Sequence, residues 1–326
     1  MASGLGCTPR SHACASQVAA VVIGSAGKGS GSNWGSLDMR SRYQLAKTGR
    51  MGARHVEGLR HLPTALVNGV EIFYDVHGSG EPLVLLHGLG ASSQDWEHQV
   101  PELAQHYRVI TPDLRGFGRS AKPRGPYSVA QFSGDMLALL DALGVSRCHL
   151  LGLSMGGAVA FQMALDQQPR FSSLIIVNSA PNFELHSWRR RLMAWTRILV
   201  PHLFGMRTLS HHVVNHLFPK PEQSELRARL IARASSNDRD AYVAAVHALK
   251  GWSIERRLGE IRTPTLVISA EFDYTPVAEK EHYVARMRNA QLRVIHDSRH
   301  ASHWDQWQAF NGLVLDFLKR HPQRAS

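Results

Sequence analysis

The fold is decided by the hexapeptide Gly152-Leu153-Ser154-Met155-Gly156-Gly157. An apolar run typical of a buried strand precedes it at residues 148–151, and a helical pattern follows it at residues 155–168. A strand that turns directly into a helix leaves no room for Cβ atoms two positions before and after the central serine, so glycine is needed there. Such a turn lifts the Ser154 hydroxyl clear of the sheet edge. The pattern therefore predicts a nucleophile held on a strained turn.

Strand-like and helix-like segments alternate on both sides of this turn. The predicted strands cover residues 82–86, 108–111, 148–152, 174–178, 265–269 and 292–295. The predicted helices cover residues 96–105, 128–143, 155–168, 277–287 and 305–320. Ahead of them, Asn68-Gly69 joins two β-rich runs, which is a strong hairpin signal. This order predicts an α/β fold with a mostly parallel sheet and helices on both faces.

One long segment interrupts the alternation. Between Ala180 and Ile261 no strand pattern appears, and amphipathic helical pieces take its place. An apolar stripe at helical spacing ends before Pro201 and is expected to form the inner core of these helices: Trp188, Leu192, Trp195 and Leu199. We therefore expect a core at residues 63–181 and 256–321, with a helical cap inserted at residues 182–255.

Residues 1–62 are rich in Gly, Ser and Arg and read as a disordered leader or extension. They carry eight basic and two acidic side chains, so their net charge of +6 is more than half of the formal net charge of +11. A nucleic-acid-binding protein concentrates such charge in a recognisable fold or patch, so nucleic acid is not an expected partner. A targeting segment and a misassigned start remain alternatives for this region.

The composition bears on compartment as well. No window approaches the ~18 consecutive apolar residues of a membrane span, so stable membrane insertion is not expected. The three cysteines are Cys7, Cys14 and Cys148, which give no disulfide framework. These features favour a cytoplasmic location over secretion or organelle targeting.

A serine needs a base, and the base needs an orienting acid, before it becomes a good nucleophile at neutral pH. In this kind of fold the three follow in the order serine, acid, histidine. The loop after the strand at 265–269 offers Glu271 and Asp273, of which Asp273 is the expected acid because Glu271 lies nearer the strand. The loop after the last strand offers His296, His300 and His303. His300 falls just before the final helix and is the expected base, with His303 as the alternative.

An oxyanion hole is expected next to the serine. The sequence His87-Gly88-Leu89-Gly90 follows the first buried strand, at the position that supplies one backbone donor in such sites. The N–H groups of Leu89 and Met155 are therefore the predicted donors. His87 is expected to brace the loop. For His303 the structural alternative is a residue packed near the start of the final helix, which Asp305 would cap.

Together these motifs resemble the α/β-hydrolase superfamily over residues 65–320, and the loop Asp113-Leu114-Arg115-Gly116-Phe117-Gly118-Arg119-Ser120 also matches it. The Ser-Met-Gly-Gly turn looks most like small bacterial carboxylesterases and lipases, with enol-lactonases and cofactor-free haloperoxidases as near relatives. Ser154 argues against the epoxide hydrolases and haloalkane dehalogenases of this fold, which have Asp there. Met155 argues against proline iminopeptidases.

The resemblance implies a serine hydrolase of short- to medium-chain carboxylic esters, acting on a small-molecule ester or lactone. Alternatives are hydrolysis of a C–C bond or an enol-lactone by the same residues, or a small-molecule receptor with a retained triad. No cofactor and no metal are expected, and the sequence does not indicate an oligomeric state. His211, His212 and His216 read as a solvated helix face, as does the basic run 189–191.

Overall fold

The computed structural model describes residues 64–323, so the predicted leader at residues 1–62 lies outside the described residues. Within that range the strands form one sheet in the order β1-β2-β4-β3-β5-β6-β7-β8. β1 and β2 pair antiparallel, β2 is antiparallel to β4, and the pairs from β4 to β8 are parallel. The strands are β1 Thr64–Val67, β2 Val70–His77, β3 Pro82–Leu86, β4 Arg108–Pro112, β5 Cys148–Leu153, β6 Phe171–Val177, β7 Thr265–Ala270 and β8 Ala290–Ile295.

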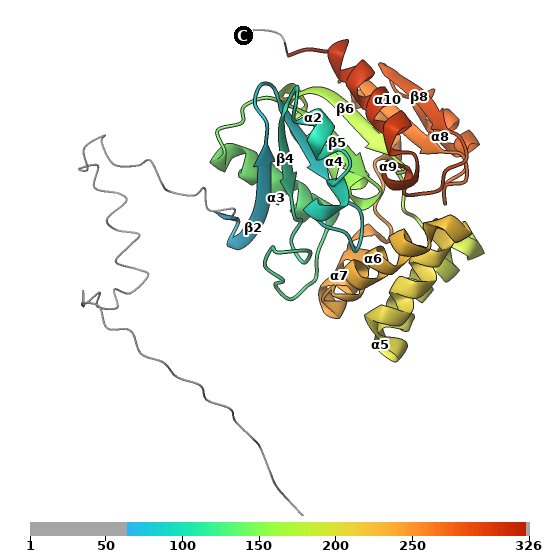
Figure 1. Ribbon diagram of the computed structural model, residues 1–326. Coiled ribbons are helices and arrows are strands. Elements are labelled where there is room, and N and C mark those ends of the chain that lie inside the picture. The colour runs from blue at the N-terminus through green and yellow to red at the C-terminus, as the bar shows by residue number, and fades with distance from the viewer. Residues whose placement is uncertain (1–63, 324–326) are drawn as a thin grey trace, which may run out of the picture. The chain divides into compact units, whose positions relative to one another are not determined.

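Helices cover both faces of the sheet (Figure 1). Alternate strand residues pack into two separate apolar clusters, because successive side chains of a strand point to opposite faces. One cluster includes α3, α4 and α8, and the other includes α2 and α10. The helices of the core are α2 Val100–Leu103, α3 Val129–Ala142, α4 Met155–Asp166, α8 Val277–Val284, α9 Ser302–Asp305 and α10 Trp307–Lys319. This is the α/β fold that the sequence predicts.

Local signals in the sequence explain several of these elements. Asn68 and Gly69 both have positive φ, 49° and 75°, as a two-residue turn between twisted strands requires. The Ser128 hydroxyl accepts a hydrogen bond from the Gln131 N–H at 3.0 Å and caps α3. Gly144, just after α3, has a φ of 64° that suits glycine. The predicted hairpin and the predicted limits of this helix are therefore confirmed.

One predicted helix is broken, and another begins slightly later than predicted. The expected helix at 96–105 is a short 3-10 turn, Ser93–Trp96, followed by α2, because Pro101 has no N–H to continue the helical hydrogen bonds. The expected helix at 305–320 is present as α10, which begins two residues later than predicted, and the short α9 precedes it. Asp305 does not cap it, since its carboxylate accepts a hydrogen bond from the Ser298 hydroxyl at 2.7 Å.

The insertion at residues 182–255 is helical, as expected, and contains α5 Trp188–Leu217, α6 Ser224–Ser235 and α7 Arg239–Leu249. These three helices gather beside one another in Figure 1. The first helix does not end at Pro201: the helical backbone is interrupted at Gly205, where φ is 80°.

The expectation that the apolar stripe of this helix forms its inner core is wrong. Trp188 is 68% exposed and Trp195 is 56% exposed, and Leu192 and Leu199 are exposed as well. The helical period locates an apolar face correctly, but it does not determine what that face contacts. Among residues 64–323, no helix combines the length and apolar character that crossing a membrane requires.

Candidate active site

Ser154 lies on the turn between β5 and α4. Its backbone angles, φ 53° and ψ −113°, are strained for a residue with a side chain. A Cβ at Gly152 would collide with the Gly156 carbonyl, and a Cβ at Gly156 would collide with the Leu86 carbonyl. The two glycines therefore permit the close approach that the turn needs, as the sequence predicts.

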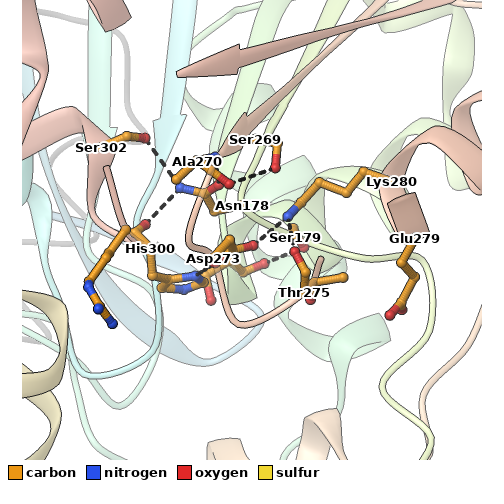
Figure 2. Close-up of polar contacts among 12 residues, drawn as sticks. Asn178, Ser179, Ser269, Ala270, Asp273, Thr275, Glu279, Lys280, His300 and Ser302 are labelled. Carbon is orange, nitrogen blue, oxygen red and sulfur yellow. Dashed lines mark hydrogen bonds and ion pairs between the residues drawn. The ribbon is translucent and has the colours of Figure 1, made fainter. Parts of the chain in front are cut away.

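Asp273 and His300 lie together at the ends of neighbouring strands β7 and β8. The Nδ1 atom of His300 is 2.5 Å from Oδ1 of Asp273, whose side chain is fully buried (Figure 2). Burial raises the pKa of Asp273, but His300 and Lys280 outweigh burial and lower that pKa to about 2. The ionised carboxylate therefore accepts the Nδ1 proton, which leaves Nε2 of His300 free to accept another.

The other carboxylate of this loop points elsewhere. Glu271 accepts a hydrogen bond from the Asp297 N–H at 2.9 Å and lies 3.4 Å from the exposed His296. Neither residue contacts His300 through a hydrogen bond or ion pair in the described part of the chain. Of the two acids considered from sequence, only Asp273 is placed to orient this histidine.

His303 is buried and has a different environment from His300. Neither ring nitrogen has a hydrogen-bond partner among the described residues. Burial, followed by the neighbouring His300 and His98, lowers the pKa of His303 to about 3. Its ring packs 5.3 Å from that of Trp96, centroid to centroid. This environment fits the structural alternative for His303, a residue packed near the start of the final helix.

The predicted oxyanion donors flank the serine. Met155 is the first residue of α4, so its N–H has no acceptor within the helix. Leu89 follows Gly88, where an added Cβ would lie only 3.5 Å from the Cβ of Ser154. His87 holds this loop: its Nε2 accepts from the Leu114 N–H at 2.9 Å, and its Nδ1 lies 2.8 Å from the Gly88 carbonyl. Burial lowers the pKa of His87, which keeps the ring neutral in this role.

Lys280 is a site residue that sequence reasoning misses. Its side chain is fully buried, and Nζ lies 2.5 Å from Oδ2 of Asp273 and 2.7 Å from the Thr275 carbonyl (Figure 2). Burial lowers the pKa of Lys280, and Asp273 opposes that effect. Asp273 is thus shared between a lysine on one oxygen and His300 on the other. Lys280 lies among charged residues of an amphipathic helix, so nothing local in the sequence distinguishes it from a solvated lysine.

Asn178 is a second residue of this kind. Its side-chain amide donates to the His300 carbonyl at 2.8 Å and to the Ser302 hydroxyl at 3.2 Å, while its oxygen accepts from the Ala270 N–H at 2.7 Å. These bonds join the ends of β6 and β7 to the loop that carries His300 (Figure 2). From sequence, this position is notable only because it lacks a carboxylate.

A cavity of about 490 Å³ lies over these residues. Ser154 and His300 both line it, although no hydrogen bond joins them in the described structure. Leu89 and Leu153 contribute apolar wall from the core, and the insertion adds a larger apolar set: Met193, Val213, Val214, Leu217, Phe218 and Leu230. The cavity therefore combines a reactive floor from the core with a mainly apolar wall from the insertion.

The three histidines of α5 interpreted from the sequence as a solvated helix face are exposed, as predicted. His211, His212 and His216 are exposed on α5, and the His216 ring stacks on Tyr274 at 5.5 Å. Residues 64–323 contain no group of three or more His, Cys, Asp or Glu side chains that could hold a metal ion.

The sheet order, the strained serine turn and the Asp273–His300 pair define a hydrolase of the α/β class. The chain belongs to the alpha/beta hydrolase fold family, whose model matches residues 81–306. It is 32% identical over 270 residues to a protein of Caulobacter segnis named "Putative carbamate hydrolase RutD", covering 79% of this chain and 99% of that one.

Solved structures of other proteins share this fold. The enol-lactonase from Burkholderia xenovorans LB400 matches with a TM-score of 0.73 and 28% identity, over 79% of this chain and all of that one. A thermophilic esterase from Thermogutta terrifontis matches with a TM-score of 0.71 and 26% identity, over 80% of this chain and 98% of that one.

Proposed function

We propose that this chain hydrolyses carboxylic esters of short to medium chain through a covalent acyl-enzyme. Ser154 is the nucleophile, His300 the base and Asp273 the residue that orients it. The observation that carries the proposal is the hydrogen bond between Asp273 and His300 beside the cavity that Ser154 lines. A serine on a strained turn, a histidine and a buried carboxylate in this order have the roles that acyl transfer needs.

The first half of the reaction forms the acyl-enzyme. Ser154 Oγ attacks the ester carbonyl carbon while Nε2 of His300 takes its proton. The N–H groups of Leu89 and Met155 stabilise the resulting oxyanion, each such donor contributing about 3 kcal/mol to the transition state. The C–O bond then breaks, and the alcohol leaves with the proton from His300.

The second half releases the acid. His300 deprotonates a water molecule, the hydroxide attacks the acyl carbon, and Ser154 recovers its proton as the carboxylic acid departs. Throughout, the ionised Asp273 stabilises the charged form of His300. The apolar wall of the cavity and its volume of about 490 Å³ favour acyl chains of short to medium length.

Hydrolysis of p-nitrophenyl esters from acetate to palmitate tests the proposal. We expect kcat/KM to peak at short or medium chains and to fall to background in Ser154→Ala. Ser235→Ala, on α6 and outside the cavity, is the matched control and should keep wild-type rates. Turnover that persists in Ser154→Ala would refute the nucleophile.

Lactones are the second candidate substrates, because the enol-lactonase of Burkholderia xenovorans shares this fold over 79% of this chain and its own full length. The relatives named for carbamate hydrolysis extend the range to carbamates, whose carbonyl the same serine can attack. Ester, lactone and carbamate substrates of similar size should therefore be compared side by side. Failure of all three with folded protein would favour C–C bond hydrolysis or a receptor.

A further inference from the structure

Arg197 lies in the wall of the cavity, on helix α5 of the insertion. Its Nη1 donates a hydrogen bond to the Tyr242 hydroxyl at 2.8 Å. Its guanidinium carbon lies 5.8 Å from the ring centroid of Tyr274, and that ring in turn lies 4.6 Å from the ring of His300. One aromatic ring therefore separates this guanidinium from the proposed base.

This guanidinium has no acidic partner in the part of the chain that the structure describes. The other arginines of the cavity wall each have one, in the pairs Arg119–Asp75, Arg190–Glu279 and Arg233–Glu97. Arg197 instead contacts neutral tyrosines, which satisfy a hydrogen bond but do not balance its charge. A partly buried charge without a counter-charge is costly, so this arrangement favours an anionic ligand.

The carboxyl groups of the cavity do not supply that counter-charge. Asp113 accepts hydrogen bonds from the N–H groups of Ser93 and Arg119 at 2.6 and 2.7 Å. Burial raises the pKa of Asp95 to about 7, so much of it is protonated near neutral pH. Neither forms an ion pair with Arg197 in the described structure. The cavity thus presents an uncompensated positive charge close to the reacting centre.

We propose that Arg197 binds a carboxylate of the substrate, so that the preferred substrate is an ester or lactone that also carries a carboxylate group. The carboxylate and the reacting carbonyl are then separated by about the width of the Tyr274 ring, which lies between Arg197 and His300. This inference rests on the proposed function for the reacting group. A guanidinium donates two parallel hydrogen bonds to a carboxylate, and Tyr242 holds the fork of Arg197 in place. The apolar wall then contacts the chain between the two groups.

The test compares charged and neutral substrates of the same shape. Mono-p-nitrophenyl adipate is paired with p-nitrophenyl 6-methylheptanoate, whose isopropyl end replaces the carboxylate. A second pair, 4-acetoxybutanoate and 4-acetoxybutanamide, places the charge on the alcohol side. We expect the wild type to prefer the charged member of at least one pair by about 10- to 100-fold in kcat/KM, as a charge-assisted contact provides.

The ratio of kcat/KM for the charged substrate to kcat/KM for the neutral one should fall towards one in Arg197→Met. It should recover in part in Arg197→Lys, which restores the positive charge but not the two parallel hydrogen-bond donors of a guanidinium. A ratio cancels any general loss of activity in these variants. Arg189→Met removes the same charge from an exposed position of the same helix, outside the cavity, and should keep the wild-type ratio. No preference in either pair, or a preference that survives in Arg197→Met, would overturn the inference.

Failure of the proposed function gives a different pattern. If neutral esters are hydrolysed and Ser154→Ala abolishes this, the esterase proposal stands whatever the charge preference. If no ester is hydrolysed, titration calorimetry with adipate still tests the carboxylate site. Binding that weakens about 10-fold or more in Arg197→Met supports the site, whereas no binding, or equal binding, refutes it.

Discussion

The end of the sheet and the helical insertion at residues 182–255 face the same cavity but are built differently. At the sheet end, Asp273 and Lys280 are completely buried, and their polar atoms are paired. In the insertion, α5 exposes large apolar side chains such as Trp188, and Arg197 has no acidic partner. A closed hydrogen-bond network holds groups in one geometry, whereas an open wall can change with little cost to the fold. The comparison therefore supports the proposal that the core supplies the reaction and the insertion selects the substrate.

The largest effect should come from His300. We expect His300→Ala to lower kcat by about 10⁴- to 10⁶-fold, because the serine loses its proton acceptor. His303→Ala should stay within about tenfold of wild type, since burial keeps the pKa of His303 near 3 and its ring nitrogens have no hydrogen-bond partner among the described residues. Steady-state hydrolysis of one p-nitrophenyl ester by both variants checks this, and the reverse result would assign the base to His303.

The next largest effect should come from the acid. We expect Asp273→Asn to lower kcat by about 10⁴-fold, because an amide neither holds the imidazole in the required tautomer nor stabilises its charge. Glu271→Gln is the matched control and should retain most activity, since Glu271 contacts the Asp297 N–H instead. Equal losses in the two variants would mean that both carboxyls of the loop serve the histidine.

The same substitution should also affect stability. Removing the carboxylate leaves the buried Lys280 without a counter-charge, which costs about 3–5 kcal/mol of unfolding free energy in comparable cases. The double variant Asp273→Asn/Lys280→Met should recover much of this stability while staying inactive. Denaturant unfolding measured beside activity therefore separates the chemical role of Asp273 from its structural one.

The sequence predicts the parts of the site that depend on local geometry or on order along the chain. The Ser154 turn needs glycines at fixed positions, and a carboxylate and a histidine follow later strands as this fold requires. Lys280 and Asn178 are not predicted from the sequence, because their roles come from contacts between different segments of the chain, such as the hydrogen bond from Asn178 to the His300 carbonyl. The break before α2 is a different case, because Pro101 signals it and the apolar pattern alone does not.

A moderate effect, on pH dependence, is expected from Lys280. In the wild type, this cation offsets part of the Asp273 charge that stabilises the protonated form of His300. Removing it in Lys280→Met should favour imidazolium, so the acidic limb of the kcat/KM profile moves to higher pH by about one unit. Asp273 loses one cause of its low pKa but keeps the contact with His300.

Lys220→Met provides the control for that profile, because Lys220 pairs with Asp297 at the surface. It should leave the acidic limb in place. An unshifted limb in Lys280→Met, with the variant folded, would mean that Lys280 only fills space behind Asp273.

The smallest effect is expected for the exposed apolar side chains of α5 in the insertion. Trp195 is 56% exposed and is not part of the cavity wall, so Trp195→Ala should change the free energy of unfolding by less than about 1 kcal/mol. Phe161 on α4 is completely buried, so Phe161→Ala should cost about 3–5 kcal/mol through lost contacts and an unfilled cavity. Chemical denaturation of both variants measures the contrast. A large loss in Trp195→Ala would mean that this face is covered in solution, and the insertion would then have a packing role that its exposed stripe does not show.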